Sequence, residues 1–116
     1  MKIGDFGKRA KPAIPILLES LRHTNNIIQA HALIALGMIG CEPEKCVPAI
    51  VPFLKSTSIS DRQKAIGALL AFGTNALPAR KVIQQAATDS DPWVRMEAKR
   101  AMAILDKAGD HGQGAP

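Results

Sequence analysis

Aromatic side chains are scarce in this sequence, which has three Phe, one Trp and no Tyr among its 116 residues. Strands of β-sandwiches and barrels favour aromatic and β-branched residues, so this shortage argues against both architectures. Hydrophobic residues still make up 47% of the chain, which is enough for one core in a domain of this length. The composition therefore predicts a single all-α domain.

A long uninterrupted apolar run is also missing. The longest candidate, residues 27–41, is shorter than a bilayer span and contains Gln29 and His31. No apolar run follows Lys2, so the N-terminus lacks the pattern of a signal peptide. The sequence therefore predicts a cytoplasmic protein with no membrane partner.

Few residues suggest metal or catalytic chemistry. Cys41 and Cys46 have no further Cys or His pair at zinc-ligand spacing, so we expect free thiols, with Cys46 packed as a small apolar residue. A disulfide between them is the alternative that the count allows. His23, His31 and His111 do not form a ligand motif, and no Gly-rich phosphate loop follows a strand pattern. The sequence predicts no catalytic, cofactor or metal site, and hence no enzyme.

An internal repeat with a period of 33 residues is the main feature that the sequence does contain. Residues 13–17 (AIPIL) align with 46–50 (CVPAI) and 79–83 (ARKVI). The second half of the unit keeps the same register, in three sets of equivalent positions: Ala32, Ala65 and Ala98; Leu36, Leu69 and Met102; Gly40, Gly73 and Asp106. A fixed period of this size is typical of stacked helical repeats.

Each unit is expected to form two helices. The predicted first helices span residues 13–21, 46–55 and 77–87, and the predicted second helices span 27–39, 61–72 and 92–107. Pro48 and Pro78 suit a first helical turn, where a missing N–H costs nothing. Pro52 lies four residues after Pro48 and predicts a late start or a bend in that helix.

Polar turns before the second helices supply the expected caps. Ser60 with Gln63 fits the reciprocal capping box, and Asp91 stands directly before a proline that suits the first helical position. Gly40 and Gly73 follow the second helices of the first two units and are the expected left-handed C-caps.

The units resemble HEAT repeats, specifically the short phycobilisome-lyase type. The resemblance is carried by residues 89–105 (DSDPWVRMEAKRAMAIL), by 35–40 (ALGMIG) and by the AIPILLESL and CVPAIVPFL helices. It implies a right-handed α-solenoid of three HEAT-like helical hairpins over residues 1–107. The expected parts are a remnant of a preceding repeat (1–7), repeats at 8–40, 41–73 and 74–107, and a disordered tail (108–116).

The three units differ at the Val-Arg pair that is usual in this family. The pair is Val94-Arg95 in the third unit, Asp61-Arg62 in the second and Ile28-Gln29 in the first. Asp61 indicates that the helix start in the second unit is less buried.

The N-terminal end of the stack is predicted to be uncapped. MKIGDFG (residues 1–7) matches the last turn of a second helix, residues 36–40, so the chain is expected to begin inside a repeat. Ile14, Leu17 and Leu18 leave the first unit apolar where a neighbouring repeat stacks. Either the rest of a longer HEAT protein or another molecule is expected to supply that neighbour.

The expected binding surface is the concave side that the resemblance implies for the second helices. In the third unit the stripe of Val94, Ala98 and Leu105 is taken by packing, which leaves Lys99 and Arg100 on the other side. Equivalent positions in the first two units are apolar. The predicted partner-binding residues are Leu33, Ile34, Ile66, Leu70, Lys99 and Arg100. The alternative is that curvature buries the apolar members, or that the helical face is displaced by one position.

The predicted function is a non-catalytic module for protein–protein contact or assembly. It would bind a partner or a second copy through the apolar concave groove and the uncapped N-terminal end. The first alternative is nucleic-acid binding through the basic third repeat, in a chain of net charge +5. The cations concerned are Arg80, Lys81, Arg95, Lys99, Arg100 and Lys107. The second alternative, implied only by the resemblance, is a subunit of a bilin lyase-like enzyme.

Overall fold

The computed structural model describes residues 8–112, with side chains up to Lys107, and all regular elements in that range are helices. They are η1 (Lys11–Ala13), α2 (Ile14–Ser20), α3 (Asn26–Ile39), α4 (Pro43–Ile50), η2 (Val51–Lys55), α5 (Ile59–Phe72), η3 (Gly73–Ala79), α6 (Arg80–Ala86) and α7 (Pro92–Gly112). The all-α prediction is confirmed. The opening MKIGDFG, with its predicted repeat remnant, lies outside the described residues.

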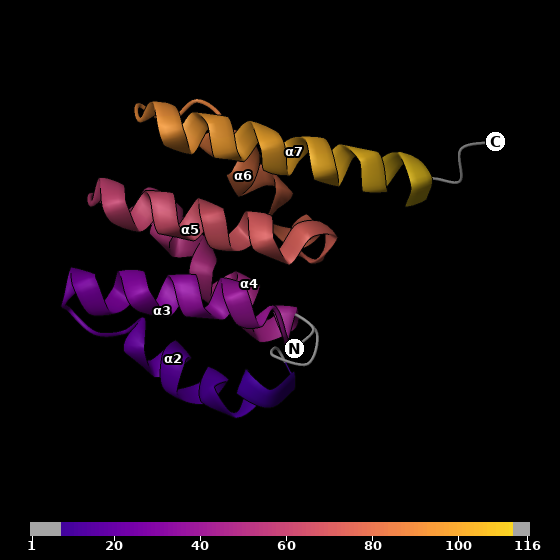
Figure 1. The fold of residues 1–116 in the computed structure, drawn as a ribbon. Helices are drawn as coiled ribbons and strands as arrows, with labels where there is room; N and C mark the ends of the chain where they lie inside the picture. The colour runs from indigo at the N-terminus through magenta and orange to yellow at the C-terminus, as the bar shows by residue number, and fades with distance from the viewer. Residues whose placement is uncertain (1–7, 113–116) are drawn as a thin grey trace.

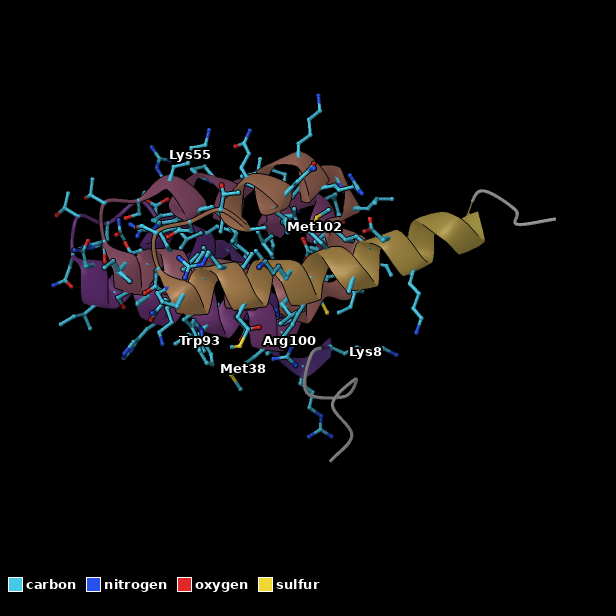
Figure 2. All side chains as sticks on the ribbon, turned by 90° about the horizontal axis from the view of Figure 1, so that it is seen from above. Lys8, Met38, Lys55, Trp93, Arg100 and Met102 are labelled. Atoms are coloured by element: carbon cyan, nitrogen blue, oxygen red, sulfur yellow. The ribbon has the colours of Figure 1, made fainter. Side chains whose placement is uncertain are left out.

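Long and short helices form two sets. The long helices α3, α5 and α7 lie side by side in chain order, from the bottom to the top of Figure 1. Each shorter helix, α2, α4 or α6, contacts the long helix that follows it in the chain. In the view from above (Figure 2), Lys55 projects on the side of α6, and Trp93 projects on the opposite side. Fully buried members of the core are Leu36, Ile50, Leu69, Ile83 and Leu105.

Helix bounds agree best with prediction in the second helix of each unit, where α3, α5 and α7 occupy the expected ranges. The expected first helices are each divided between an α-helix and 3-10 turns. Because α4 begins at Pro43, Pro48 lies inside the helix, and its predicted place in a first turn is wrong. Pro78 likewise lies within η3, before α6 begins. The change from α4 to η2 occurs next to Pro52, as expected from a proline that cannot donate a helical hydrogen bond.

Caps of the long helices are partly as predicted. The Asp91 carboxylate accepts a hydrogen bond from the Val94 N–H at 3.0 Å and another from the Gln63 carboxamide at 3.1 Å. Both bonds lower the pKa of Asp91, and the bond from Gln63 has the larger effect. The predicted Ser60–Gln63 box is wrong, because α5 begins at Ile59, before the expected start at residue 61, and Ser58 accepts from the Asp61 N–H instead, at 3.3 Å.

The two glycines that follow α3 and α5 differ in conformation. Gly40 is left-handed, with φ 64° and ψ 18°, which confirms the predicted C-cap of α3. Gly73 also has a positive φ of 59°, but its ψ of −132° lies outside the left-handed helical region. The chain therefore leaves α5 in a different direction and continues directly into η3.

Helix α7 is longer than predicted. It continues to Gly112, past the expected end at Lys107, while the disordered tail expected from Ala108 stays a prediction. Extending an existing helix adds one hydrogen bond for each residue fixed, without the cost of nucleation, so no tertiary partner is needed at its end. Residues 113–116 lie outside the described range.

One side-chain contact recurs in all three units with the 33-residue period. The Gln29 carboxamide donates to the His23 carbonyl, the Arg62 guanidinium donates to the Ser56 carbonyl at 2.8 Å, and the Arg95 guanidinium donates to the Asp89 carbonyl at 2.9 Å. In each case a side chain in the first turns of a long helix satisfies a carbonyl in the loop before that helix. A glutamine and two arginines therefore do the same structural work, although their charges differ.

Arg62 also connects consecutive units. Its guanidinium donates to both carboxylate oxygens of Asp89 in the next loop, at 3.0 and 3.3 Å. The Arg62 and Asp89 side chains are only 13% and 11% exposed, so water screens this ion pair weakly.

Asp61 is deeply buried, although the sequence indicated a less buried helix start at this position. The residue is 1% exposed, and its Oδ1 has no hydrogen-bond partner among the described residues. Burial raises the pKa of Asp61, and a hydrogen bond with the Ser56 side chain opposes this effect. The equivalent residue of the third unit, Val94, is also fully buried, whereas Ile28 of the first unit is 37% exposed, so the position belongs to the core in the second and third units.

Both cysteines are free thiols, as predicted. Cys46 is buried in the core, and its Sγ lies 3.4 Å from the Cys41 carbonyl oxygen. Burial raises the pKa of Cys46 to about 11, so this thiol is protonated at neutral pH. The prediction that Cys46 packs as a small apolar residue is confirmed.

Two helical glycines are expected to respond in opposite directions to the same substitution. A Cβ at Gly37 would lie 2.9 Å from the Ala68 Cα in α5, whereas a Cβ at Gly67 would meet no atom within 4 Å. Gly67→Ala should therefore raise the free energy of unfolding by about 1 kcal/mol through helix propensity. Gly37→Ala should lower it by about 1–2 kcal/mol, because forced overpacking exceeds that gain. Urea denaturation measures both values, and a Gly37→Ala variant as stable as Gly67→Ala would contradict the close packing of α3 on α5.

Candidate protein-binding groove

Two of the predicted partner-binding residues are buried. Leu33 and Ile66 are each 0% exposed, so the prediction that they line an open groove is wrong. Leu33 lies one turn before Gly37, which packs against the backbone of Ala68 in α5, so this side of α3 faces the next long helix. Lys99, the equivalent residue of α7, is exposed, because α7 is the last long helix in the described part of the chain.

The remaining predicted residues are distributed over two sides of the long helices. Ile34, Lys99 and Arg100 are exposed, whereas Leu70 is half-buried and packs against the core. The structure thus fits the alternative that the true solvent-facing positions are displaced by one residue from the predicted face. The apolar character of the first two units at the predicted face is explained by stacking of one long helix on the next.

A different set of residues forms a continuous groove on the side of the long helices that faces away from the shorter ones. Figure 2 shows Met38 and Trp93 projecting together on this side, with Arg100 near them. We define the groove by the residues of the three helices that line it: Ile27, His31, Ile34 and Met38 of α3; Ser60, Lys64, Gly67 and Ala71 of α5; Trp93 and Glu97 of α7.

Two adjoining hollows make up the groove. One, of about 440 Å³, lies between α3 and α5 and reaches from Ile27 to Lys64. The other, of about 310 Å³, lies over α5 between Met38 of α3 and Trp93 of α7. The hollows share Ile34 and Lys64, so they run into each other at the middle of α5.

Large apolar side chains form the walls of the groove, and small residues form its floor. Met38 and Trp93 are 61% and 50% exposed, and Ile27 and Ile34 are also exposed. In contrast, α5 presents Ser60, Gly67 and Ala71, of which Gly67 leaves open space above its Cα. With the 33-residue period, Gly67 of the second unit is equivalent to Ile34 of the first. This change from a large to a small residue at equivalent positions was the signal by which the sequence could have revealed the groove.

The charges in the groove are unevenly satisfied. Glu97 is 7% exposed, and its Oε2 lies 3.5 Å from the Arg100 guanidinium, although it has no hydrogen-bond partner among the described atoms. Lys64 is half-buried, lines both hollows and takes part in none of the ion pairs formed by the described side chains. The accessible charge at the centre of the groove is therefore positive.

Several basic residues of the third unit are held in contacts with other residues. Arg80 of α6 pairs with Asp106, Arg95 donates to the Asp89 and Ser90 carbonyls, and Arg100 pairs with Glu97. The two ion pairs neutralise part of the positive charge of this unit.

The apolar residues that the sequence assigned to an uncapped end are covered in the structure wherever they lie in the described range. Ile14 is buried in the core, and Leu17 and Leu18 are half-buried against it. Ile16, between them, is the most exposed of the large apolar residues in the described range.

No helix in the described range has the length and apolar character needed to cross a bilayer. Among the same residues, no three His, Cys, Asp or Glu side chains come together as metal ligands.

Comparison with family models finds none that matches this chain, and comparison with curated proteins finds no match either.

Proposed function

We propose that the chain is a short right-handed α-solenoid of three HEAT-like helical hairpins. Three observations support this proposal: the order of short and long helices repeats three times, the long helices lie side by side, and one side-chain-to-carbonyl contact recurs every 33 residues. Burial at one set of equivalent positions supports it as well, since Leu33 and Ile66 are buried where a following unit is present and Lys99 is exposed where none is described.

The proposed function is a non-catalytic protein–protein interaction or assembly module, placed in the cytoplasm, that binds a partner through the groove. The observation that carries it is the combination of exposed apolar walls, led by Met38 and Trp93, with a floor of small residues. Exposed apolar patches rimmed by polar groups mark interaction sites, because covering them removes apolar area from water. A helical segment fits such a groove by placing its own apolar stripe between the walls.

Nucleic-acid binding has less support from the structure. Of the six cations proposed for it, Arg80 and Arg100 are paired with carboxylates and Arg95 is held by loop carbonyls. The other three, Lys81 of α6 and Lys99 and Lys107 of α7, are exposed, and nucleic-acid binding would depend on them. Duplex binding whose affinity falls steeply with salt and with removal of these three lysines would favour it.

A matched pair of variants tests the groove as the binding surface. We expect Met38→Glu to abolish capture of partners from an extract of the source cell, because it places a charge on the apolar wall. Leu77→Glu is the control, since Leu77 is also a large exposed apolar residue but lies on η3, outside the groove. Quantitative mass spectrometry of the captured proteins, together with thermal unfolding of each variant, gives the readout.

The proposal predicts a set of proteins held by the wild type and by Leu77→Glu but lost from Met38→Glu. Equal capture by all three would place the binding surface elsewhere. Loss with both variants, at unchanged melting temperatures, would also contradict the groove, because it would show a nonspecific effect of added charge.

A further inference from the structure

The chemistry of the groove identifies the kind of partner more closely, if the proposed function holds. We infer that the partner is an amphipathic helix that carries an acidic residue beside its apolar stripe, and that Lys64 binds this carboxylate. The inference depends on the shape of the groove, on the accessible charge at its centre and on the length of α5.

The shape of the groove fits a helix better than a second groove. Walls of Ile34 and Met38 on α3 and Trp93 on α7 stand on either side of the small residues of α5. If a second copy presented the same face, its apolar walls would contact the walls of the first copy and the floor would stay unfilled. A convex surface can instead enter the groove and contact Gly67 and Ala71. A helix has such a surface, and Gly67 lets its backbone approach closely, since no atom occupies the space above it.

The length of α5 limits the contact to about four turns. This helix has 14 residues, which correspond to about 21 Å at 1.5 Å per residue. A partner helix of that length offers apolar residues at positions i, i+4, i+7 and i+11, which is enough to contact both hollows.

The charge of the groove selects the sign of the partner. Lys64 stands where the two hollows meet, is half-buried and has no carboxylate partner among the described side chains. The carboxylate of the groove, Glu97, is already beside Arg100 and is almost fully covered. A partner therefore meets an available cation and a compensated anion. The net charge of +5 adds long-range attraction for an acidic segment.

An ion pair between Lys64 and a carboxylate of the partner is favourable in this position. Once a helix covers the groove, water is excluded and the attraction between opposite charges becomes stronger. A cationic residue in the same place would instead be repelled by Lys64. The neighbouring Ser60 and His31 supply additional polar groups that line the first hollow with Lys64.

Three synthetic peptides test the inference. Each is an alanine- and glutamine-based helix of about five turns with leucines at the spacing given above. They differ at one central position beside the leucines, which carries Glu, Gln or Lys. The single tryptophan of the protein, Trp93, lies in the wall of the groove, so its fluorescence reports binding directly. We expect the Glu peptide to bind about tenfold more tightly than the Lys peptide at low salt, with the Gln peptide between them.

Lys64→Met is the decisive variant, because it keeps an apolar stem of similar size and removes the charge. We expect it to bind all three peptides with similar affinity. Lys55→Met is the control, since Lys55 is an exposed lysine on the opposite side of the molecule (Figure 2), and the tenfold preference should remain. The preference should also decrease as salt screens the pair.

The possible failures are distinguishable. If all three peptides bind the wild type equally, or if the preference survives Lys64→Met, the groove still binds helices but the acidic partner is wrong. Tighter binding of the Lys peptide would show that Glu97 selects the partner and would overturn the inference. If no peptide binds, the groove fails as a docking surface, and the proposed function fails with it.

A second copy of the chain as occupant is tested separately. Sedimentation of the wild type and of Met38→Glu should show the same monomeric species. A dimer that dissociates in Met38→Glu would place the second copy in the groove and would overturn the inference.

Discussion

Leu33→Ala is expected to lower the free energy of unfolding by about 3 kcal/mol, the range found when a fully buried leucine is truncated. Leu33 of α3 is 0% exposed. It lies one turn from Gly37, whose close approach to Ala68 brings α3 and α5 into tight contact. The surrounding helices can relax only partly around the lost atoms, so a cavity adds to the lost burial.

Ile34→Ala is the matched control, because Ile34 is the next residue on the same helix and is exposed in the groove. Its effect on stability should stay within about 0.5 kcal/mol. Urea denaturation followed by far-UV circular dichroism compares the two variants, and the slope of the transition should not change. Equal effects would contradict the assignment of Leu33 to the stacking side and Ile34 to the groove.

Arg62→Met is expected to lower the free energy of unfolding by about 3 kcal/mol. The methionine preserves much of the apolar stem but removes both hydrogen bonds to Asp89 and the bond to the Ser56 carbonyl. Asp89 then remains as a charge that is only 11% exposed and has lost its counter-ion. Most of the effect comes from this uncompensated charge and not from the net value of the ion pair.

The control for this prediction is Arg22→Met. Arg22 faces Glu19 at 4.0 Å, and both side chains are largely exposed, so the change should cost less than about 1 kcal/mol. Adding Asp89→Asn to Arg62→Met should restore part of the lost stability, because it removes the unpaired charge. If Arg62→Met costs no more than Arg22→Met, the contact between consecutive units contributes little to the fold.

Much of the secondary structure could be predicted because its signals are local. The cap at Asp91 and the left-handed Gly40 each depend on residues within one turn of their own position. The errors arose where several local signals compete. Ser58 and Ser60 are both acceptable caps, and Pro43 and Pro48 both suit a first turn, so the start of each helix was decided by the packing of the units.

The groove was mispredicted for a different reason. A long helix in this stack has apolar contacts with the shorter helices, with the preceding long helix and with the following one, so three of its sides need apolar residues. In α3 this leaves few polar residues, Gln29 and His31 among them, to mark the solvent side. A helical wheel can then find the apolar stripe but cannot separate a side that faces a neighbour from one that faces water.

The residue pattern along the chain was sufficient for the helical class, the repeat and the free thiols, because these follow from local hydrogen bonding, backbone preference and spacing. Which apolar residues are buried was decided by the tertiary structure. Leu33 and Ile34 are chemically similar neighbours, yet one lies in the core and the other in the groove. The physical reason is that burial depends on where the adjacent helix lies, and that position is set by long-range packing, such as the contact of Gly37 with Ala68.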